Sequence, residues 1–332
     1  MTDKLHVAVV GLGLIGTSVG LALRRYPEKV TVVGHDPSPE LSSKAKRAGA
    51  VERAEWNLIS AIAKADRIVL ALPLDQIRPT LEAMKGELQP GCIIIDTADV
   101  KAPVMAWAAE ILPPEVHFVG GHPILLTDRF DADAARADLF EGRLFALTPD
   151  PRTDATGVRL AADIVEAMGA KPYFIDAQEH DGLAGGAQQL PALLAAALMS
   201  VTSAAPGWKE MRKLAGNQFY AGTLLMAGSG QELANGALAN RDNTLHWLDA
   251  VVAELTSYRA QLASGETEQL AAGVDRGLAA GKNWLNASLS GNWDAENLPA
   301  PPQVGMGLRE MFFGRLGKAP DRAKQAEKGK RP

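Results

Sequence analysis

Cysteine is almost absent from the sequence, because Cys92 is the only one among 332 residues. A single cysteine excludes an internal disulfide and any metal site built from several thiolates. Long hydrophobic runs are also absent, since no stretch reaches the roughly 18–20 apolar residues that a membrane helix needs. Residues 1–4 lead directly into a strand-like pattern and show no signal peptide. We therefore expect a cytoplasmic protein without a membrane partner.

Positive charge is not in excess. The 34 Lys and Arg residues stand against 39 Asp and Glu residues, which gives a formal net charge of −5. This balance argues against a nucleic-acid partner, because phosphate backbones are bound by clusters of basic side chains. Hydrophobic residues make up 47% and charged residues 22%, as in globular proteins with packed cores. The length predicts about two domains.

Short apolar runs alternate with helical patterns in the first half of the chain. Most of the runs are rich in Val and Ile and end at Gly, Pro or Asp, which is typical of buried strands in a parallel sheet. This alternation predicts βαβ units and an α/β Rossmann fold with a doubly wound, mainly parallel sheet. We expect strands at residues 5–10, 30–34, 67–72, 92–96, 117–119, 144–148 and 173–175, and helices at 15–25, 40–48 and 76–88.

The composition changes near residue 177. Beyond it there is no convincing strand pattern, and helical patterns rich in Ala and Leu cover residues 190–203, 222–227, 244–262 and 266–286. Helices that are apolar on several faces pack against each other or against a second subunit. We predict a Rossmann domain at residues 1–176, an all-α domain at 177–313 that holds substrate and forms a homodimer, and a basic, flexible tail at 314–332.

A glycine motif follows the first predicted strand. Gly11, Gly13 and Gly16 form a Gly-x-Gly-x-x-Gly pattern between a strand and a helix. Such glycines permit a tight turn, close approach of a pyrophosphate and close packing of the helix on the strand. The phosphates then rest on free N–H groups at the helix N-terminus. The motif predicts a dinucleotide site that includes the intervening Leu14 and Ile15.

Asp36 stands 20 residues after the last glycine, where a ribose-binding acid is expected. Its carboxylate would accept hydrogen bonds from both ribose hydroxyls and repel a 2′-phosphate. No Lys or Arg occurs at residues 37–40. These features favour NAD as the cofactor, with NADP still possible. Leu72 and Pro73 close a later strand, where the chain is expected to pass over the cofactor.

A dehydrogenase that oxidises an alcohol needs a base near the hydroxyl group. Among six histidines, His122 is the best candidate, because it follows Gly120 and Gly121 at the end of a predicted strand. Ligands of open α/β folds bind at that edge of the sheet. The other interpretation is a histidine that only packs at a strand end.

Several motifs together resemble the prephenate/arogenate dehydrogenases of tyrosine biosynthesis. The resemblance covers roughly residues 5–264 and implies a Rossmann domain, an intertwined helical dimerisation domain and oxidative decarboxylation of a cyclohexadienol. It places His122 at the position of the family's catalytic histidine. The motifs are the glycine pattern, Asp96-Thr-Ala-Asp-Val-Lys101, Gly120-Gly-His-Pro123, Leu139-Phe-Glu-Gly142 with Leu147-Thr-Pro149, Glu179-His-Asp181 and Asn240-Arg241.

The substrate half departs from the family pattern. Asp99 replaces a serine, Gln188 and Gln189 begin a stretch in which the family has two histidines, and Tyr220 stands where the family has an arginine. Tyrosine cannot reproduce the bidentate charged hydrogen bonds of arginine. We expect Gln188, Gln189 and Tyr220 to contact substrate, and Lys101 is a candidate for the missing positive charge.

These departures leave three interpretations open. The first is a prephenate or arogenate dehydrogenase with a divergent pocket. The second is a dehydrogenase of the same superfamily that acts on another hydroxy acid. The third is a dimeric dinucleotide-binding protein without catalysis, against which the retained His122 argues.

Asp99 and His122 both follow strand ends at the predicted ligand-binding edge, and the resemblance places the family's serine beside the catalytic histidine. We therefore assign both residues to the catalytic group and predict that they interact. A carboxylate there would raise the pKa of the histidine and orient its ring. Alternatively, Asp99 faces solvent or caps the helix that begins near Lys101.

Overall fold

A computed structural model describes residues 4–127, 129–224, 229–291 and 293. The chain divides into two compact units, residues 1–259 and residues 260–332. The first unit contains the whole sheet, the helices that flank it and most of the helices that follow. The second contains the end of one long helix and the whole of the next. The predicted basic tail lies outside the described residues, and the predicted domain boundaries stay a prediction.

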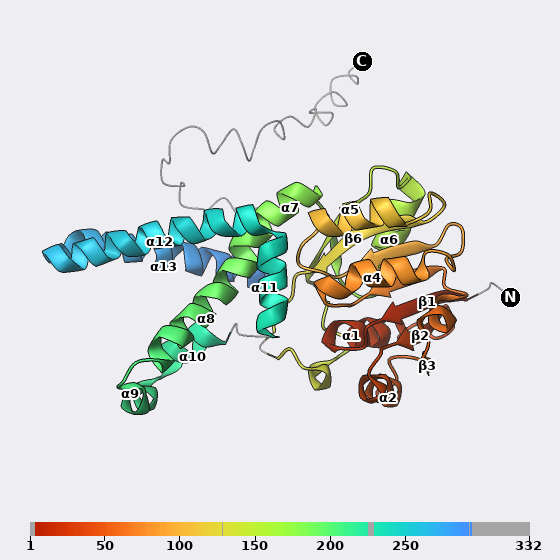
Figure 1. Ribbon diagram of the computed structural model, residues 1–332, viewed down its shortest axis with the longest axis horizontal. Coiled ribbons are helices and arrows are strands. Elements are labelled where there is room, and N and C mark those ends of the chain that lie inside the picture. Colours follow the sequence, from red (N-terminus) through yellow and green to blue (C-terminus); the bar gives the residue numbers. More distant parts are fainter. Residues whose placement is uncertain (1–3, 128, 225–228, 292, 294–332) are drawn as a thin grey trace, which may run out of the picture. The chain divides into compact units, whose positions relative to one another are not determined.

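The first unit is built on one eight-stranded sheet with the order β3-β2-β1-β4-β5-β6-β7-β8 (Figure 1). Neighbouring strands run parallel except β6 and β7, which pair antiparallel. The predicted doubly wound, mainly parallel Rossmann sheet is therefore confirmed. The strands are β1 (Leu5–Val10), β2 (Val30–His35), β3 (Arg53–Glu55), β4 (Arg67–Leu70), β5 (Ile93–Asp96), β6 (His117–Pro123), β7 (Leu144–Pro149) and β8 (Lys171–Phe174).

Alternating side chains of the strands build a core on each face of the sheet. In β1, Val7 and Val9 join one buried cluster, whereas Ala8 and Val10 join the other. Because both clusters are covered by helices, the strands are apolar on both sides, as parallel strands must be. Helices α1 (Leu14–Leu23), α2 (Pro39–Arg47) and α6 (Ala155–Ala167) contribute to the first cluster. Helices α3 (Leu58–Ile62), α4 (Leu74–Met84) and α5 (Ala102–Ile111) contribute to the second.

Helices follow the last strand of the sheet. A continuous helical run starts with α7 (Ala177–Ala184), passes through one π-helical turn, η2 (Gly185–Gln189), and continues as α8 (Leu190–Ser203). A π turn carries one extra residue per turn and commonly marks a functional site. The remaining helices are α9 (Trp208–Leu214), α10 (Asn217–Thr223), α11 (Gly230–Ala239), α12 (Arg241–Ser264) and α13 (Thr267–Ser290), and a short 3₁₀ turn, η1 (Ala132–Ala134), precedes β7.

Two sequence predictions need correction. The short strand β3 was not predicted, since three residues at the sheet edge show no apolar run. The helix expected at residues 222–227 begins earlier, at Asn217, and ends at Thr223. Residues 225–228 of that expected helix lie outside the described residues.

The run Ala177–Ser203 is the one described helical stretch that is long and apolar enough to cross a membrane by length and composition alone. Three buried polar residues lie within it, His180, Asp181 and Gln189. Each of them is hydrogen-bonded to another part of the first unit. The run is therefore tied to the sheet through its polar side chains.

Candidate active site

The glycine loop lies between β1 and α1. Gly11 has φ of +91°, and a Cβ atom there would lie 2.2 Å from the carbonyl oxygen of Ala71. A Cβ at Gly16 would lie 1.8 Å from the carbonyl oxygen of Gly11. Only glycine fits at either position, because the helix and the loop after β4 approach the turn so closely.

Gly13 differs from the other two glycines, since a Cβ there would meet no atom within 4 Å. It is the N-cap of α1 and makes no side-chain cap, and the first turn of α1 carries no acidic residue. The first N–H groups of a helix bind anions readily when no side chain caps them. The open side of the loop therefore fits a phosphate group.

Asp36 is anchored to the glycine loop. Its Oδ2 accepts a hydrogen bond from the Leu12 N–H at 2.7 Å, and its Oδ1 accepts one from the Ser38 N–H at 2.8 Å. A carboxylate has about four acceptor positions. The side chain thus keeps acceptor capacity for ribose hydroxyls while it fixes the loop that faces the phosphates.

The other residues predicted at the cofactor site surround the same loop. Leu14 is buried and Ile15 half-buried in the first turn of α1. The side chain of Leu72 lies near Gly11, 3.1 Å from the position that a Cβ would occupy. Pro73 is exposed at the N-cap of α4. Their contacts with a cofactor stay a prediction.

A buried ion pair lies beneath the carboxyl edge of the sheet. Lys101, the N-cap of α5, is fully buried and pairs with Asp96 at the end of β5, which is also fully buried. The Lys101 ammonium donates to the Gly121 carbonyl oxygen at 2.6 Å, and the Gly121 N–H donates to Asp96 Oδ1 at 2.9 Å. These contacts join β5, β6 and the start of α5.

The structure does not bring Lys101 to an open surface, because its ammonium is enclosed and already paired, so its contact with substrate stays a prediction. Its side chain has an exposed fraction of 0%. Burial lowers the pKa of its ammonium, while Asp96 opposes that shift. Lys101 holds the strand that carries the candidate base.

Asp181 of α7 caps α5. Its Oδ1 accepts a hydrogen bond from the Lys101 N–H at 2.6 Å, and its Oδ2 accepts one from the Ala102 N–H at 2.8 Å. The carboxylate is buried and meets the positive end of the α5 dipole, where negative charge is stabilised. Helix α7 is thereby attached to the edge of the sheet where the strands end.

His122 contacts His180 through its imidazole ring. The Nδ1 atom of His122 lies 2.9 Å from the Nε2 atom of His180, and the two rings meet edge to face. The Nδ1 atom of His180 lies 2.9 Å from Asp181 Oδ1. Both rings are buried. The three side chains form one hydrogen-bonded row.

The predicted pairing of His122 with Asp99 is not found in the structure, because His122 contacts His180 and Asp99 bonds to Gln189. The direction of the pKa shift is wrong as well. Burial holds the pKa of His122 well below its usual value near 6.5, and neighbouring His180 and Lys101 lower it further. His122 is therefore neutral at physiological pH, as a base must be before it accepts a proton.

Asp99 lies in a neighbouring cluster of hydrogen-bonded polar side chains. Its Oδ2 accepts a hydrogen bond from Gln189 Nε2 at 3.1 Å. Gln189 lies in the π turn, and its Oε1 accepts a bond from Asn240 Nδ2 at 3.3 Å. Asn240 also donates to the Asp181 carbonyl oxygen at 2.7 Å. Asp99 is half-buried and does not cap α5, since Asp181 does so.

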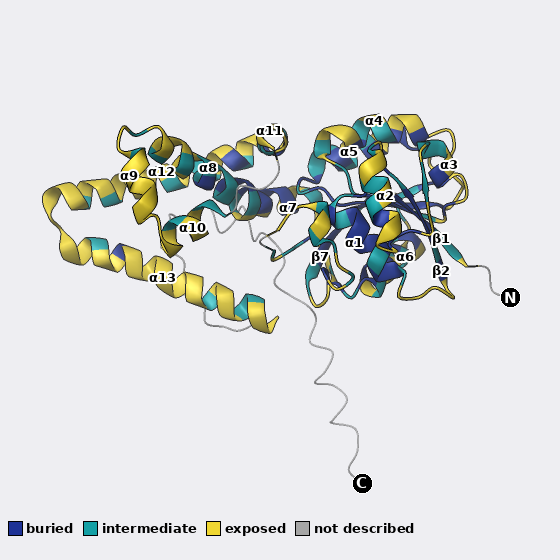
Figure 2. Cartoon of the chain, turned by 90° about the horizontal axis from the view of Figure 1, so that it is seen from below, coloured by how far each residue is buried: buried dark blue, intermediate teal, exposed yellow. Residues whose placement is uncertain are grey.

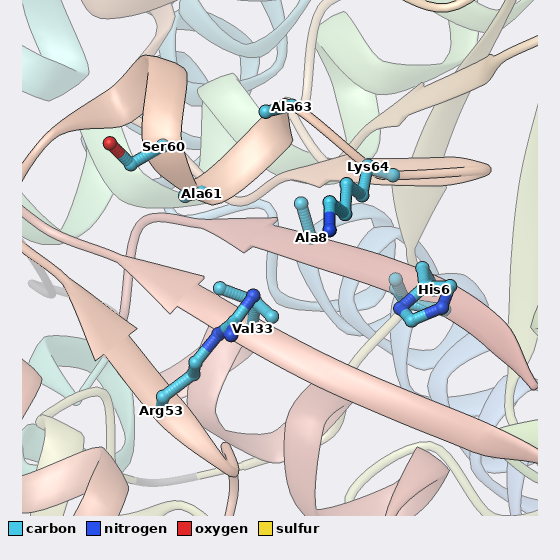
Figure 3. A pocket seen from close by; sticks show the side chains of 10 residues that line it. His6, Ala8, Val33, Arg53, Ser60, Ala61, Ala63 and Lys64 are labelled. Atoms are coloured by element: carbon cyan, nitrogen blue, oxygen red, sulfur yellow. The ribbon is translucent and has the colours of Figure 1, made fainter.

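A small cavity of about 80 Å³ lies elsewhere in the first unit, between α3 and the first three strands (Figure 3). Its lining includes His6, Arg53 and Lys64. None of the residues that line it belongs to the glycine loop or to the His122 row. The cavity is separate from the candidate site.

Comparison with known proteins gives two family matches. Residues 19–174 match the prephenate dehydrogenase nucleotide-binding domain, and residues 176–276 match the prephenate dehydrogenase dimerization domain. A cyclohexadienyl dehydrogenase of Zymomonas mobilis is 30% identical over 276 residues, which cover 81% of this chain and 92% of that protein. The chain belongs to the prephenate dehydrogenase family.

Solved structures of the family share this fold. An arogenate dehydrogenase of Synechocystis is 25% identical, with a TM-score of 0.69 over 84% of this chain and 100% of that chain. A prephenate dehydrogenase of A. aeolicus, solved with hydroxyphenyl propionate and NAD⁺, has a TM-score of 0.74 at 24% identity over 82% of this chain and 96% of that chain. The glycine motif precedes the matched range, so its assignment depends on its own geometry.

Within this prephenate dehydrogenase family member, the sequence did not identify three side chains of the site. His180, Asp181 and Asn240 belong to motifs that carried the family resemblance, but no role was predicted for them. The two motifs that contain these residues were the sequence features from which their place in the site could have been predicted. Gln188 is half-buried and Tyr220 is 63% exposed on α10, so their contact with substrate stays a prediction.

Proposed function

We propose that this chain is an NAD-dependent dehydrogenase that oxidises and decarboxylates a cyclohexadienol carboxylate, prephenate or arogenate, in tyrosine biosynthesis. The observation that carries the proposal is the buried His122 near the end of β6, at the sheet edge that also holds the glycine loop. The glycine loop follows β1, and β1, β4, β5 and β6 run parallel. Their carboxyl ends therefore bring the base and the dinucleotide loop to one edge of the sheet, where ligands of such folds bind.

The residues of the glycine loop fit NAD. Gly13 leaves room for the pyrophosphate, the free N–H groups of α1 would bind it, and Asp36 would accept from the adenosine ribose. A 2′-phosphate would meet the Asp36 carboxylate with no cation at residues 37–40 to compensate. NAD is therefore favoured over NADP. When bound, the cofactor accepts the hydride that leaves the substrate.

His122 would accept the proton of the substrate hydroxyl as hydride leaves the same carbon, so that a carbonyl group forms. The bond to the ring carboxylate then breaks, carbon dioxide leaves, and its electron pair makes the ring aromatic. The imidazolium returns its proton to the phenolate oxygen. No proton is gained or lost overall, and His122 ends in its starting state.

Asp99 bears on the choice between the two acids. Prephenate carries a keto group in its side chain, whereas arogenate carries an ammonium group. The half-buried Asp99 carboxylate accepts a hydrogen bond from the Gln189 amide and forms no salt bridge within the described part of the chain. If the Asp99 carboxylate faces the substrate, it repels the two carboxylates of prephenate. It would attract the ammonium group of arogenate. We expect arogenate to have the lower KM.

The helical half supports a homodimer. It matches the family's dimerization domain, and α12 exposes Leu245, Val252 and Leu255 at spacings of seven and three residues. That spacing places them on one face of the helix. Figure 2 shows exposed residues along most of α13 as well. Two such faces bury each other in a symmetric pair.

Turnover with a panel of substrates tests the function. Prephenate, arogenate and aliphatic 3-hydroxy acids are each offered with NAD and with NADP, and formation of reduced cofactor and release of carbon dioxide are both recorded. The proposal expects equal amounts of the two products with a cyclohexadienol and NAD. Turnover of an aliphatic hydroxy acid alone would support the other dehydrogenase interpretation. Binding of NAD without any turnover would leave the non-catalytic one.

A further inference from the structure

We propose that His180 and Asp181 are positioning residues that keep the hydrogen of neutral His122 on Nδ1 and leave Nε2 as the free acceptor for the substrate hydroxyl. The inference rests on the proposed role of His122 as base. It concerns which nitrogen of the imidazole accepts the proton, which the family assignment does not specify. The directions of the hydrogen bonds are fixed at Asp181, which accepts from two backbone N–H groups.

Asp181 acts only as an acceptor. Its two carboxylate oxygens accept the N–H groups of Lys101 and Ala102 at 2.6 and 2.8 Å. Backbone N–H groups cannot accept, so neither contact requires a proton on the carboxylate. The position at the N-terminus of α5 also stabilises its negative charge. An ionised carboxylate has no hydrogen to donate.

The direction of the next bond follows. His180 Nδ1 lies 2.9 Å from Asp181 Oδ1, so this nitrogen must carry the hydrogen. A neutral imidazole has one N–H and one bare nitrogen. With Nδ1 protonated, the Nε2 atom of neutral His180 is an acceptor.

The same reasoning applies to the last bond of the row. His180 Nε2 lies 2.9 Å from His122 Nδ1, so His122 must donate from Nδ1 when both rings are neutral. The lone pair of His122 is then on Nε2. The hydrogen bond made by one ring nitrogen determines what the other nitrogen can do.

Several charged groups surround the two rings. Lys101 acts on His122 from the start of α5 and is itself paired with Asp96 at the end of β5. Asp181 of α7 contacts His180, and Asp99 interacts electrostatically with Lys101. Lys101 disfavours a positive charge on His122, whereas Asp181 lies against His180.

This arrangement has a consequence that NMR can measure. Free imidazole side chains favour the tautomer with hydrogen on Nε2, so the proposal requires the less common form at His122. Selective ¹⁵N labelling of histidine distinguishes the two forms by the chemical shifts of Nδ1 and Nε2, without substrate. The His122 signals are assigned by their loss in His122→Asn.

Two variants of His180 test whether a hydrogen-bond acceptor at this position is enough to set the tautomer of His122, or whether the imidazole ring is needed. His180→Leu removes the acceptor, and His122 should revert to the Nε2–H tautomer. His180→Gln offers an amide oxygen, which can accept from Nδ1 and should restore the wild-type tautomer in part. His246→Leu, which removes an exposed histidine of α12, is the control and should leave the spectrum of His122 unchanged.

Kinetics provide a second readout. His180→Leu and Asp181→Asn should lower kcat about 10²- to 10⁴-fold, the size expected when a catalytic histidine loses its correct tautomer, with little change in KM. His180→Gln should recover part of that loss. Asp154→Ala removes the side-chain cap of another helix, α6, and controls for the loss of a helix cap alone.

An Nε2–H tautomer of His122 in the wild-type protein would overturn the proposal. Equal kcat in His180→Leu and wild type would overturn it too. The NMR result does not depend on turnover. If the wild-type chain oxidises neither prephenate nor arogenate, the proposed function fails while the tautomer assignment is still decided by the spectra.

Discussion

The imidazole of His122 lies among groups that disfavour a positive charge. Burial lowers its pKa most, followed by His180 and Lys101. The base works only when neutral, so kcat should stay constant down to pH values below about 6.5, the ordinary pKa of histidine, and fall only as pH drops through the lowered pKa. The pH dependence of kcat measures where this fall at low pH begins. An acidic limb above that value would contradict the structure and restore the raised pKa that the sequence suggested.

Lys101 stabilises the fold near the site, because it neutralises the buried Asp96 carboxylate. Lys101→Met would leave Asp96 buried and unpaired, and breaking a buried pair in this way costs about 3–5 kcal/mol. Urea unfolding measures the loss. Lys213→Met is the control, because Lys213 and Glu210 form an exposed pair at 2.7 Å, and such a pair is worth about 0–1 kcal/mol. Similar losses in both variants would argue against a structural role for Lys101.

At the scale of the element, the glycine loop allows a matched pair of variants. Gly16→Ala introduces a Cβ at 1.8 Å from a backbone oxygen, so the turn must shift and both stability and NAD binding should fall. Gly13→Ala places its Cβ in open space, so stability should change by less than about 1 kcal/mol, in keeping with an exposed substitution. NAD binding should still weaken, because the new methyl group lies where the pyrophosphate approaches.

Thermal unfolding and NAD titration distinguish the two effects. Loss of stability without loss of affinity in Gly13→Ala would contradict the assigned phosphate site. Gly86→Ala, another site where a Cβ meets no neighbour, is the control and should affect neither quantity.

Elements with a local pattern were predictable from the sequence. The apolar runs located seven of the eight strands, because buried parallel strands such as β5 are apolar on both faces. The glycine motif located the nucleotide loop, since its geometry depends on adjacent residues. The strand β3 has only three residues and exists because it pairs with β2. A pattern of that length carries no signal.

The partner of His122 was not predictable in the same way. His122 and His180 are 58 residues apart and meet because Asp181 attaches α7 to the start of α5. The sequence placed Asp99 and His122 at one sheet edge but could not show that His122 would contact His180 of α7 and Asp99 would bond to Gln189. The π turn that brings Gln189 to Asp99 also has no sequence pattern of its own. Its surroundings include Trp247, which donates to the Gly182 carbonyl oxygen and lies against Gly186 of the turn.

The proposed homodimer depends on the exposed apolar face of α12. Replacing Val252 and Leu255 with Glu places charges on the apolar face of α12 and should shift the protein from dimer to monomer, because buried unpaired charges are costly. Sedimentation equilibrium at micromolar concentration measures the mass. A wild-type monomer would contradict the proposed dimer, and a dimer of the double variant would place the interface elsewhere.

In the proposed reaction, this member of the prephenate dehydrogenase family oxidises a cyclohexadienol with His122 as base. The most direct measurement is single-turnover formation of NADH by the wild-type protein and by His122→Asn, each saturated with NAD and mixed with arogenate or prephenate. The account predicts a rate at least about 10²-fold lower in the variant, with NAD affinity nearly unchanged. Equal rates in the two proteins, or no NADH from the wild-type protein with either acid, would contradict it.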